Sequence, residues 1–253
     1  MNPQGQAAIV TGGASGLGAA AASSLRGRGA SVAIVDADAE RAHEYAAEIG
    51  ALALTCDVRD GDSAKRAVEA AREAHGPARI LVNCAGIGTP GKAVGRDGPL
   101  PLEVFSRVIE VNLIGTFNVI RLAASEMQKL DAVDDDERGV IVNTASVAAY
   151  DGQIGQVAYS ASKGGIHSMT LPVARDLASR GVRVCTIAPG VLLTPLMDVL
   201  PEEAQKSLGE SVPFPARLGK ASEYAELAIH ICENDYLNAE TIRLDGALRM
   251  AAK

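Results

Sequence analysis

Short runs of aliphatic and β-branched residues alternate along the chain with longer stretches in which apolar residues recur at helical spacing. The short runs are almost wholly apolar. We predict seven strands from them, at residues 7–10, 32–35, 51–54, 80–83, 140–143, 183–187 and 241–244. Strands that are apolar on both faces are typical of a parallel sheet with helices on both sides. The pattern therefore predicts an α/β fold with one doubly wound parallel sheet of about seven strands.

Three stretches interrupt this alternation. Residues 88–101 are rich in glycine and proline, residues 131–138 are acidic, and residues 191–218 contain four prolines. We predict surface loops for the first two. The third is too long for a plain connection and is predicted to be a lid over the substrate. Because the chain has neither internal repeats nor a linker, we predict a single domain over residues 1–253.

Charge and hydropathy narrow the class of partner. Lys and Arg number 24 against 31 Asp and Glu, and this net charge of −7 disfavours nucleic acid and anionic membranes as partners. There is no uninterrupted apolar run of the roughly 18 residues that a membrane span needs. The first ten residues also lack the features of a signal peptide. We expect a soluble protein that acts on a small molecule.

The cysteines and histidines show no spacing typical of metal ligands. The cysteines are far apart in the chain and are predicted to be free, buried thiols, which fits a reducing compartment and hence the cytoplasm. The histidines fall on predicted helices or at their ends. We therefore expect no metal site at any of these residues: Cys56, Cys84, Cys185, Cys232, His43, His75, His167 and His230.

A glycine-rich turn follows the first predicted strand and leads into an alanine-rich helix predicted over residues 19–28. Glycines permit a tight turn and the close approach of a pyrophosphate, and free N–H groups at a helix start attract phosphate. An ordinary strand-to-helix turn can contain the same glycines, so the motif needs support from its context. The cofactor-binding residues expected in this turn are Gly12, Ser15, Gly16, Leu17 and Gly18.

Asp36 follows the second predicted strand and supplies that context. It lies eighteen residues after Gly18, close to where an acidic side chain binds the ribose hydroxyls of a dinucleotide. A carboxylate there repels a 2′-phosphate, and no Lys or Arg follows it. The alternative role of Asp36, as a helix N-cap, is disfavoured by the phosphate turn before it. We therefore predict a Rossmann-like fold that binds NAD(H) rather than NADP(H).

Tyr159 and Lys163 are four residues apart and lie on one face of a predicted helix. The pKa of an unperturbed tyrosine is about 10, too high for an effective base at neutral pH. A nearby ammonium group should lower it, so that Tyr159 can exchange a proton with an alcohol or carbonyl oxygen. Ser146 follows a predicted strand, at the sheet edge where ligands bind. A surface pair is the alternative for Tyr159 and Lys163, but the nucleotide turn and Ser146 favour catalysis.

In this order, the motifs resemble those of the short-chain dehydrogenase/reductase family over essentially the whole chain. The matching segments are Thr11 to Gly18, Asp57-Val58, Asn83-Cys84-Ala85-Gly86, the set Ser146, Tyr159 and Lys163, and Pro189-Gly190. One residue departs from the family pattern, because Cys84 stands where the family usually has a second asparagine. This change is not expected to disturb the backbone contacts of the turn.

The resemblance implies roles for further residues. Asn112 would join Ser146, Tyr159 and Lys163 as a catalytic residue and hold a water in a proton relay to Lys163, which would also bind the nicotinamide ribose. Asp57 and Val58 would hold the adenine, and Thr194 would meet the nicotinamide carboxamide. The other cofactor contacts implied are Asn83, Ala85, Gly86, Pro189 and Gly190. The family also implies a homotetramer, with the helices predicted at 102–130 and 157–180 at one interface.

Within the family, several segments resemble the type 2 3-hydroxyacyl-CoA dehydrogenase branch: residues 83–87, 115–122, 143–149, 212–215 and 242–247. This resemblance implies NAD-linked oxidation of a secondary alcohol to a ketone, with a short-chain 3-hydroxyacyl-CoA as substrate. In that branch the segment corresponding to residues 88–101 is longer and more basic, whereas this chain retains Lys92 and Arg96.

The substrate side is less defined by the sequence. Ser146 and Tyr159 are expected to bind the substrate oxygen. Gln153 and Gln156 either orient the substrate or only begin the helix. A stripe of apolar residues in the predicted lid either lines an acyl pocket or belongs to the core: Leu192, Leu193, Leu196, Met197, Val199, Leu200 and Phe214.

Three alternative functions stay open. The first is a 3-oxoacyl-carrier-protein reductase, against which Asp36 speaks because that reaction in the family usually uses NADPH. The second is a dehydrogenase of hydroxysteroids or other secondary alcohols. The third is a non-catalytic, nucleotide-sensing scaffold with the same fold. The scaffold would be expected to lack Ser146, Tyr159 or Lys163, and all three are present.

Overall fold

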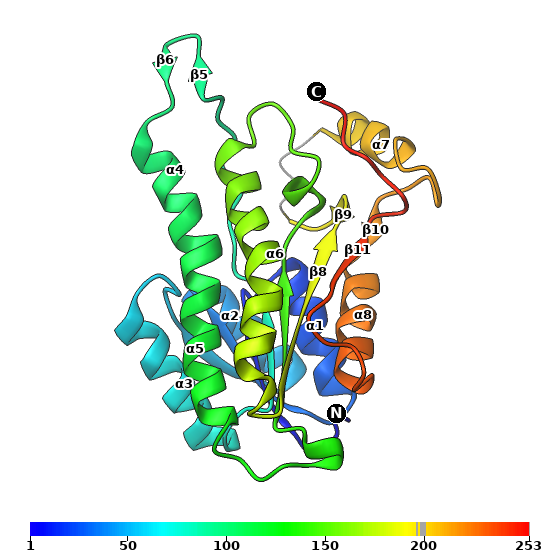
Figure 1. Ribbon diagram of the computed structural model, residues 1–253. Helices are drawn as coiled ribbons and strands as arrows, with labels where there is room; N and C mark the ends of the chain where they lie inside the picture. Colours follow the sequence, from blue (N-terminus) through cyan, green and yellow to red (C-terminus); the bar gives the residue numbers. More distant parts are fainter. Residues whose placement is uncertain (196, 198–200, 253) are drawn as a thin grey trace.

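The structure is a computed structural model that describes residues 1–195, 197 and 201–252. Seven strands form its central sheet: β1 (Ala7–Thr11), β2 (Ser31–Asp36), β3 (Leu52–Thr55), β4 (Ile80–Asn83), β7 (Gly139–Thr144), β8 (Val182–Pro189) and β11 (Thr241–Leu244). Every strand pairing in this sheet is parallel, and the order is β11-β8-β7-β4-β1-β2-β3 (Figure 1). The predicted doubly wound sheet of seven strands is confirmed, and each predicted strand end lies within two residues of the observed one.

The apolar strands are explained by burial on both faces. All six residues of β7 are buried. Its alternate side chains point to opposite faces, so that Val140 and Val142 join one core cluster and Ile141 joins the other. The strand order reverses between β1 and β4, and ligands of open α/β sheets bind at the carboxyl edge beside such a reversal. A ligand site is therefore expected at the carboxyl ends of β1, β4 and β7.

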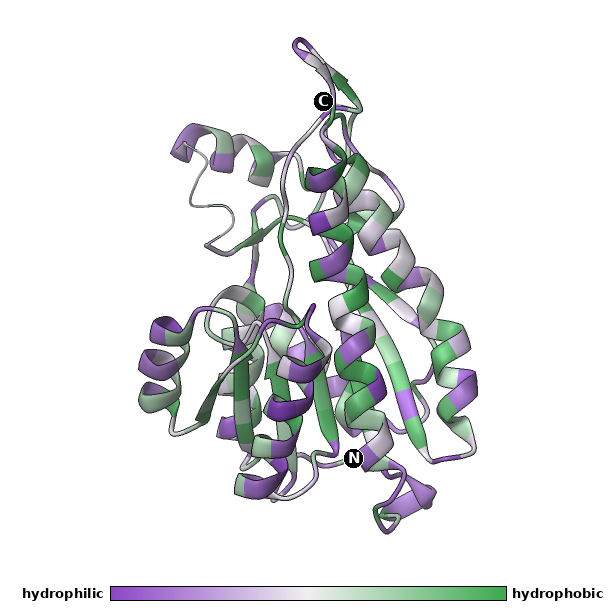
Figure 2. Cartoon of the chain, turned by 90° about the vertical axis from the view of Figure 1, so that its left-hand side faces the viewer, coloured by the Kyte–Doolittle hydropathy of each residue, from purple (hydrophilic) through white to green (hydrophobic). Residues whose placement is uncertain are grey.

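Helices cover both faces of the sheet (Figure 1). One core cluster contains side chains of α1 (Gly16–Gly27), α2 (Ala39–Ile49) and α8 (Ala221–Glu233). The other contains side chains of α3 (Gly61–His75), α5 (Gly115–Met127) and α6 (Val157–Ala178). Figure 2 shows the strands as mainly hydrophobic and the helices as alternating between hydrophobic and hydrophilic stretches. The chain thus forms one Rossmann-like domain with a three-layer core.

A helical stretch is present where one was predicted over residues 102–130, but it is not one regular α-helix. It consists of α4 (Leu102–Ile109), a π-helical turn at Glu110–Ile114 and α5, and it ends at Met127. The interruption lies at Asn112, whose side chain bonds to the loop after β4. Such π-helical turns frequently mark functional sites. The apolar periodicity of the sequence predicts a regular helix because it contains no sign of the hydrogen bonds that the Asn112 side chain makes.

Residues 102–127 form one helical stretch that is long and apolar enough, by length and composition alone, to cross a membrane. Half of its most apolar window is buried inside the protein. In the fold this stretch packs against α3 and α6. The buried half of this window is therefore accounted for by packing in the core.

All three stretches that interrupt the alternation contain short regular elements. Residues 131–138, predicted to be a surface loop, include a 3₁₀-helical turn at Asp134–Asp136. Residues 88–101 include the hairpin of β5 (Val94–Gly95) and β6 (Gly98–Pro99). Residues 191–218 include β9 (Leu192–Leu193), which pairs with β10 (Gly219–Lys220), and α7 (Glu202–Glu210). Figure 1 shows the hairpin and α7 at the end of the molecule toward which the arrow of β8 points. Both segments thus lie at the carboxyl edge of the sheet.

Candidate active site

Ser146, Tyr159 and Lys163 come together at the carboxyl edge of β7. Ser146 follows this strand closely and is fixed by the N–H of Ala148, which donates to its Oγ at 3.1 Å. Its hydroxyl is hydrogen-bonded to the phenol of Tyr159, in the first turn of α6. One turn further along the helix, Lys163 is 4% exposed, and its Nζ lies 5.7 Å from the centre of the Tyr159 ring. The fold thus brings the three predicted residues into one site.

Burial dominates the electrostatics of this site. Desolvation lowers the pKa of Lys163 to about 8, and its Nζ donates to the carbonyl oxygen of Thr144 at 2.8 Å. Desolvation raises the pKa of Tyr159, and the hydrogen bond from Ser146 opposes that rise. The prediction that Lys163 lowers the Tyr159 pKa is therefore wrong for the protein without ligands. The ammonium group is directed at Thr144, and the loss of water around the phenol outweighs its attraction.

Asn112 is fully buried beside this group, at 0% exposure. Its Oδ1 accepts the N–H of Ile87 at 2.8 Å, and its Nδ2 donates to the carbonyl of Ile87 at 2.9 Å and to Ser162 Oγ at 3.0 Å. A Cβ on Gly86 would lie 3.2 Å from Asn112 Oδ1 and 3.5 Å from Lys163 Nζ. The side chain of Asn112 therefore joins the loop after β4 to α6, beside Lys163. The water held by Asn112 in a relay stays a prediction.

The glycine-rich turn is so tight that side chains would not fit. Gly12 has a φ of +63°, and a Cβ there would lie 2.7 Å from the nitrogen of Ala85. A Cβ on Gly18 would lie 2.1 Å from the carbonyl oxygen of Gly12. Ser15 is the N-cap residue of α1 and makes no capping hydrogen bond through its side chain, while Leu17 packs against the core. The backbone thus presents the start of α1 to a ligand at close range.

Asp36 ends β2 next to this turn. Its Oδ2 accepts the N–H of Ala14 and its Oδ1 accepts the N–H of Asp38, both at 3.1 Å. The N-cap of α2 is Asp38, whose side chain accepts the N–H of Arg41. Capping is therefore not the role of Asp36. Its carboxylate is fixed beside the glycine-rich turn, as the predicted contact with a ribose requires.

The two residues expected around the adenine follow β3, and Asn83, which is expected to support the cofactor, ends β4. Asp57 forms an ion pair with Arg59 at 2.6 Å, which lowers the Asp57 pKa through its hydrogen bonds. Val58 is buried, and a Cβ on Gly115 would lie 2.5 Å from its Cγ2. Asn83 is buried at the end of β4, and its Nδ2 donates to the side chain of Asn143 at 2.9 Å. The contact between Asn83 and Asn143 connects the ends of the neighbouring strands β4 and β7.

The residues expected near the nicotinamide follow β8. Pro189 ends that strand, and the N–H of Gly190 donates to the carbonyl of Leu244 in β11 at 2.9 Å. A Cβ on Gly16, in the glycine-rich turn, would lie 3.5 Å from Thr194. The segment after β8 therefore reaches over the start of α1. The turn expected to bind the pyrophosphate and the segment expected to meet the nicotinamide thus lie side by side.

These features fit a dinucleotide. The glycine-rich turn admits a pyrophosphate, the carboxylate of Asp36 faces the ribose position, and Lys163 is the buried cation at the other end. The described residues contain no group of three or more His, Cys, Asp or Glu side chains that could hold a metal ion. The four cysteines are free; Cys56, Cys185 and Cys232 are buried, and Cys84 is half-buried.

The two glutamines on the substrate side are held by contacts within the protein. The N–H of Gln153 donates to Gln156 Oε1 at 3.0 Å, and Gln153 Nε2 donates to the carbonyl of Ala251 at 3.0 Å. Both side chains also line a cavity of about 530 Å³ that opens beside the hairpin of β5 and β6. They shape the loop before α6, and their contact with a substrate stays a prediction.

The apolar stripe in the predicted lid divides into different environments. Leu192 is 7% exposed and belongs to the core cluster beneath α8, whereas Leu193 and Phe214 are 52% and 83% exposed. Met197 is half-buried. Part of the stripe therefore packs into the core. Three of its members lie outside the described residues: Leu196, Val199 and Leu200.

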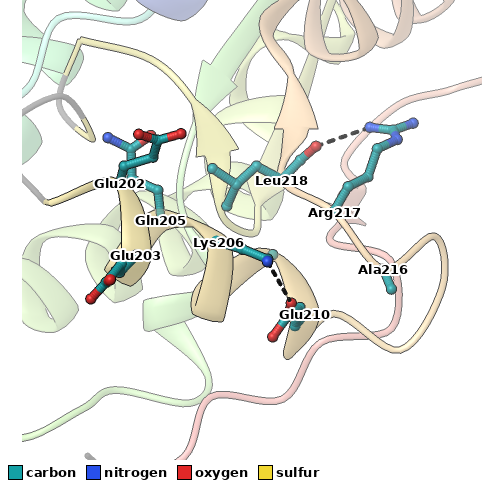
Figure 3. Close-up of a pocket in the computed structure, with 9 residues that line it drawn as sticks. Glu202, Glu203, Gln205, Lys206, Glu210, Ala216, Arg217 and Leu218 are labelled. Atoms are coloured by element: carbon teal, nitrogen blue, oxygen red, sulfur yellow. Dashed lines mark hydrogen bonds and ion pairs between the residues drawn. The ribbon is translucent and has the colours of Figure 1, made fainter.

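A cavity of about 630 Å³ lies between α7 and the segment from Ala216 to Leu218 (Figure 3). Its lining includes Glu202, Lys206 and Arg217, and Figure 3 shows Lys206 paired with Glu210. Neither Ser146, Tyr159 nor Lys163 contributes to it. This cavity, with its charged lining, is therefore separate from the candidate active site.

The sequence did not identify Thr144 or Ile87 as parts of the site. Both act through main-chain atoms, Thr144 by accepting from Lys163 and Ile87 by bonding to Asn112. Every residue has a carbonyl and nearly every residue an N–H, so residue type gives no sign of these contacts. The available signal was the position of Thr144 at the end of a buried strand.

The chain as a whole is similar to members of a known family. A family model described as short chain dehydrogenase matches residues 6–205. The chain is 50% identical to 3-hydroxyacyl-CoA dehydrogenase type-2 of Drosophila melanogaster, over 96% of each chain. It is 49% identical to the protein of the same name from Homo sapiens, over 98% of this chain and 96% of the other. The crystal structure of 3-hydroxyacyl-CoA dehydrogenase type-2 from Mycobacterium avium is similar with a TM-score of 0.94 and 43% identity, over 98% of both chains. The chain therefore belongs to the short-chain dehydrogenase family of oxidoreductases.

Proposed function

We propose that the protein oxidises short-chain 3-hydroxyacyl-CoA to 3-oxoacyl-CoA with NAD⁺ as acceptor. The set of Ser146, Tyr159 and Lys163 beside the glycine-rich turn carries this proposal. The substrate class is supported by the relatives at 49% and 50% identity, which are named for this activity and align over nearly their whole length.

Each member of this set has a separate task. Ser146 and Tyr159 hold the substrate oxygen through their hydroxyls, which already bond to each other. Tyr159 removes the proton of the alcohol, and the charge of Lys163 stabilises the phenolate once substrate and cofactor complete the site. Asn112 keeps the loop after β4 in register with α6. A bound nicotinamide supplies the hydride acceptor, so the protein has to position and polarise rather than carry the electrons.

NAD(H) is favoured over NADP(H) by Asp36. Its carboxylate is held by the N–H groups of Ala14 and Asp38, so that it cannot turn away from a ligand without losing two hydrogen bonds. A 2′-phosphate at this position would face a negative charge. The remaining cofactor contacts are proposed for the strand-end residues described above: Asp57, Val58, Asn83, Ala85, Gly86, Pro189, Gly190 and Thr194.

The proposal is tested by following NAD⁺ reduction with a panel of alcohols: 3-hydroxybutyryl-CoA, longer 3-hydroxyacyl-CoA chains, hydroxysteroids and simple secondary alcohols. We expect the highest kcat/KM for 3-hydroxybutyryl-CoA. A higher kcat/KM for a hydroxysteroid would contradict the proposed substrate class but would agree with the proposed oxidation of a secondary alcohol. Binding of NADH without turnover of any alcohol would favour the scaffold function instead.

We also propose a homotetramer that uses α4, α5 and α6 at one interface, in a reducing cytoplasmic compartment. Large apolar side chains on these helices and on the π-helical turn between α4 and α5 are open to solvent in the single chain: Leu102, Ile114, Phe117, Val157 and Leu171 are between 42% and 74% exposed. Burying them against a second copy would remove this apolar area from water. Light scattering of the purified protein tests the assembly, and a monomer would contradict it.

A further inference from the structure

Tyr224 of α8 is completely buried, and its hydroxyl approaches the candidate site from the opposite face of the sheet. The oxygen lies 2.7 Å from Oγ1 of Thr144, the last residue of β7, and 3.4 Å from Sγ of Cys84, the residue after β4. A buried hydroxyl is stable only when it is hydrogen-bonded. Tyr224 finds both partners at the sheet edge where Lys163 lies.

The direction of these hydrogen bonds follows from the number of hydrogens available. Thr144 Oγ1 lies 2.6 Å from the carbonyl oxygen of Asn83, which can only accept, so the single hydroxyl hydrogen of Thr144 goes there. Tyr224 must therefore donate to Thr144. Burial raises the pKa of the Cys84 thiol and raises the pKa of Tyr224 well above its usual value, so both groups remain protonated. The thiol of Cys84 is then the donor to Tyr224.

Thr144 is the link between this chain of hydrogen bonds and the lysine. Its side chain points to the α8 face of the sheet, together with Val140 and Val142. Its carbonyl oxygen accepts Lys163 Nζ at 2.8 Å, and Lys163 comes from α6 on the other face. Thr144 is thus held by Tyr224 on one face of the sheet, and its carbonyl oxygen holds Lys163 on the other face.

We propose that Tyr224 is a positioning residue of the active site, which fixes Thr144 through its hydroxyl and so places the amine of Lys163. The role rests on the proposed function, because it concerns the proton transfer by Tyr159 that Lys163 supports. The Tyr224 hydroxyl acts on Lys163 through Thr144, so its loss should lower the rate less than the loss of a catalytic group. A displacement of about 1 Å in an active site costs on the order of 100-fold in rate.

The test compares Tyr224→Phe with wild type in the full chain, using the alcohol of the panel that wild type oxidises best. We expect kcat to fall about tenfold, within the range that small displacements produce. The KM for the alcohol should stay nearly unchanged. The rise of kcat with pH should move to higher pH, because a less firmly placed ammonium stabilises the Tyr159 phenolate less.

Tyr45→Phe is the matched control. Its hydroxyl, on α2, donates to the carbonyl of Ala19 at 2.9 Å, so the substitution also removes one hydrogen bond of a tyrosine. This variant should keep the kcat and the pH profile of wild type. If Tyr224→Phe lowers only the melting temperature and its kinetics match those of Tyr45→Phe, Tyr224 is a packing residue and the proposal is wrong.

A second measurement does not depend on turnover. NMR titration of the ligand-free protein with ¹³C-labelled lysine reports the buried Lys163 amine, whose pKa is lowered to about 8 by desolvation. The titratable groups around it are Tyr159 in its own helix and Cys84 after β4, with Tyr224 reaching it through Thr144. In Tyr224→Phe the titration should move to lower pH, since the charged amine loses part of its hydrogen bond to the carbonyl. An unchanged titration would overturn the proposal.

A third test uses the variant Thr144→Val. It removes the hydroxyl that accepts from Tyr224 but keeps the carbonyl that holds Lys163. If both residues act through one path, the double variant with Tyr224→Phe should lose no more activity than Thr144→Val alone. Losses that multiply would contradict a shared path. Should wild type oxidise no alcohol of the panel, the proposed function fails, and the NMR titration still decides the role of Tyr224.

Discussion

Lys163 Nζ lies 5.7 Å from the centre of the Tyr159 ring at the carboxyl edge of β7, with the lysine buried and the tyrosine partly exposed. Burial acts on the two groups in opposite directions, because it disfavours the charged form of each. It raises the pKa of Tyr159 and lowers that of Lys163 to about 8. The protein therefore holds a cation in a dry site before any ligand binds, and this arrangement is destabilising wherever the lysine is charged.

The stability of wild type should reveal that buried charge. Relative to Lys163→Met, we expect the free energy of unfolding of wild type to rise between pH 8 and pH 10.5. In this window the folded lysine, with a pKa of about 8, has released its proton while the unfolded one, with a pKa of 10.5, retains it. The unfolded chain then binds more protons, so stability rises with pH. The full shift corresponds to about 3 kcal/mol at most.

Urea denaturation of both proteins at one protein concentration, repeated across this pH range, gives the difference. The variant shares every other titrating group with wild type, so their contributions cancel. A difference that does not change with pH would show that the amine is in contact with water.

Tyr159→Phe should remove turnover and leave cofactor binding nearly intact. The substitution keeps the ring and deletes the hydroxyl that bonds to Ser146. General acid–base groups contribute on the order of 10²- to 10⁴-fold, so we expect kcat to fall about 10³-fold. NADH binding followed by fluorescence should stay within a factor of about two, because that hydroxyl serves the substrate oxygen.

Tyr150→Phe is a control on the same side of the molecule. Tyr150 donates to or accepts from His167 at 3.1 Å and is 41% exposed. Its substitution should leave kcat close to that of wild type. Substantial activity in Tyr159→Phe would remove Tyr159 from the role of base.

Asp36→Asn should weaken the choice between NAD⁺ and NADP⁺. The amide retains an oxygen that can accept the N–H of Ala14 but loses the negative charge next to the ribose position. We expect the ratio of kcat/KM for NADP⁺ to that for NAD⁺ to rise on the order of tenfold, the equivalent of about 1.4 kcal/mol. Asp38→Asn removes a neighbouring charge at the N-cap of α2 and should leave this ratio nearly unchanged. Equal ratios in the two variants would place the selectivity elsewhere.

The sequence was sufficient to predict those features of the fold and the site that residue type and spacing determine. The seven strands were found because runs such as Ile80–Asn83 are buried on both faces and are apolar up to their last residue. Tyr159 and Lys163 were placed together because four residues span one helical turn. The glycine-rich turn was located for a related reason, since the spaces at Gly12 and Gly18 exclude any Cβ.

The sequence was insufficient where distant segments meet or main-chain atoms act. Tyr224 reaches Thr144 only because α8 packs on the sheet, and neither residue differs in type from many other buried ones. The π-helical turn at Asn112 depends on a hydrogen bond to Ile87 that apolar periodicity does not contain. The sign of the Tyr159 pKa shift depends on burial, which spacing cannot give.

Gly18→Ala should damage the nucleotide site through sterics alone. A Cβ at this position would lie 2.1 Å from the carbonyl oxygen of Gly12 and 3.0 Å from the Cα of Gly13, and both neighbours are backbone atoms that cannot rotate away. The turn must open to accept the methyl group, so we expect a loss of about 1–3 kcal/mol in stability and weaker NADH binding. Gly27→Ala, in the last position of the same helix, meets nothing within 4 Å. It should stabilise the protein by about 0.4–1 kcal/mol and leave NADH affinity unchanged. Thermal unfolding and NADH titration of both variants separate the two effects, and an unimpaired Gly18→Ala would mean that the turn is wider than the structure shows.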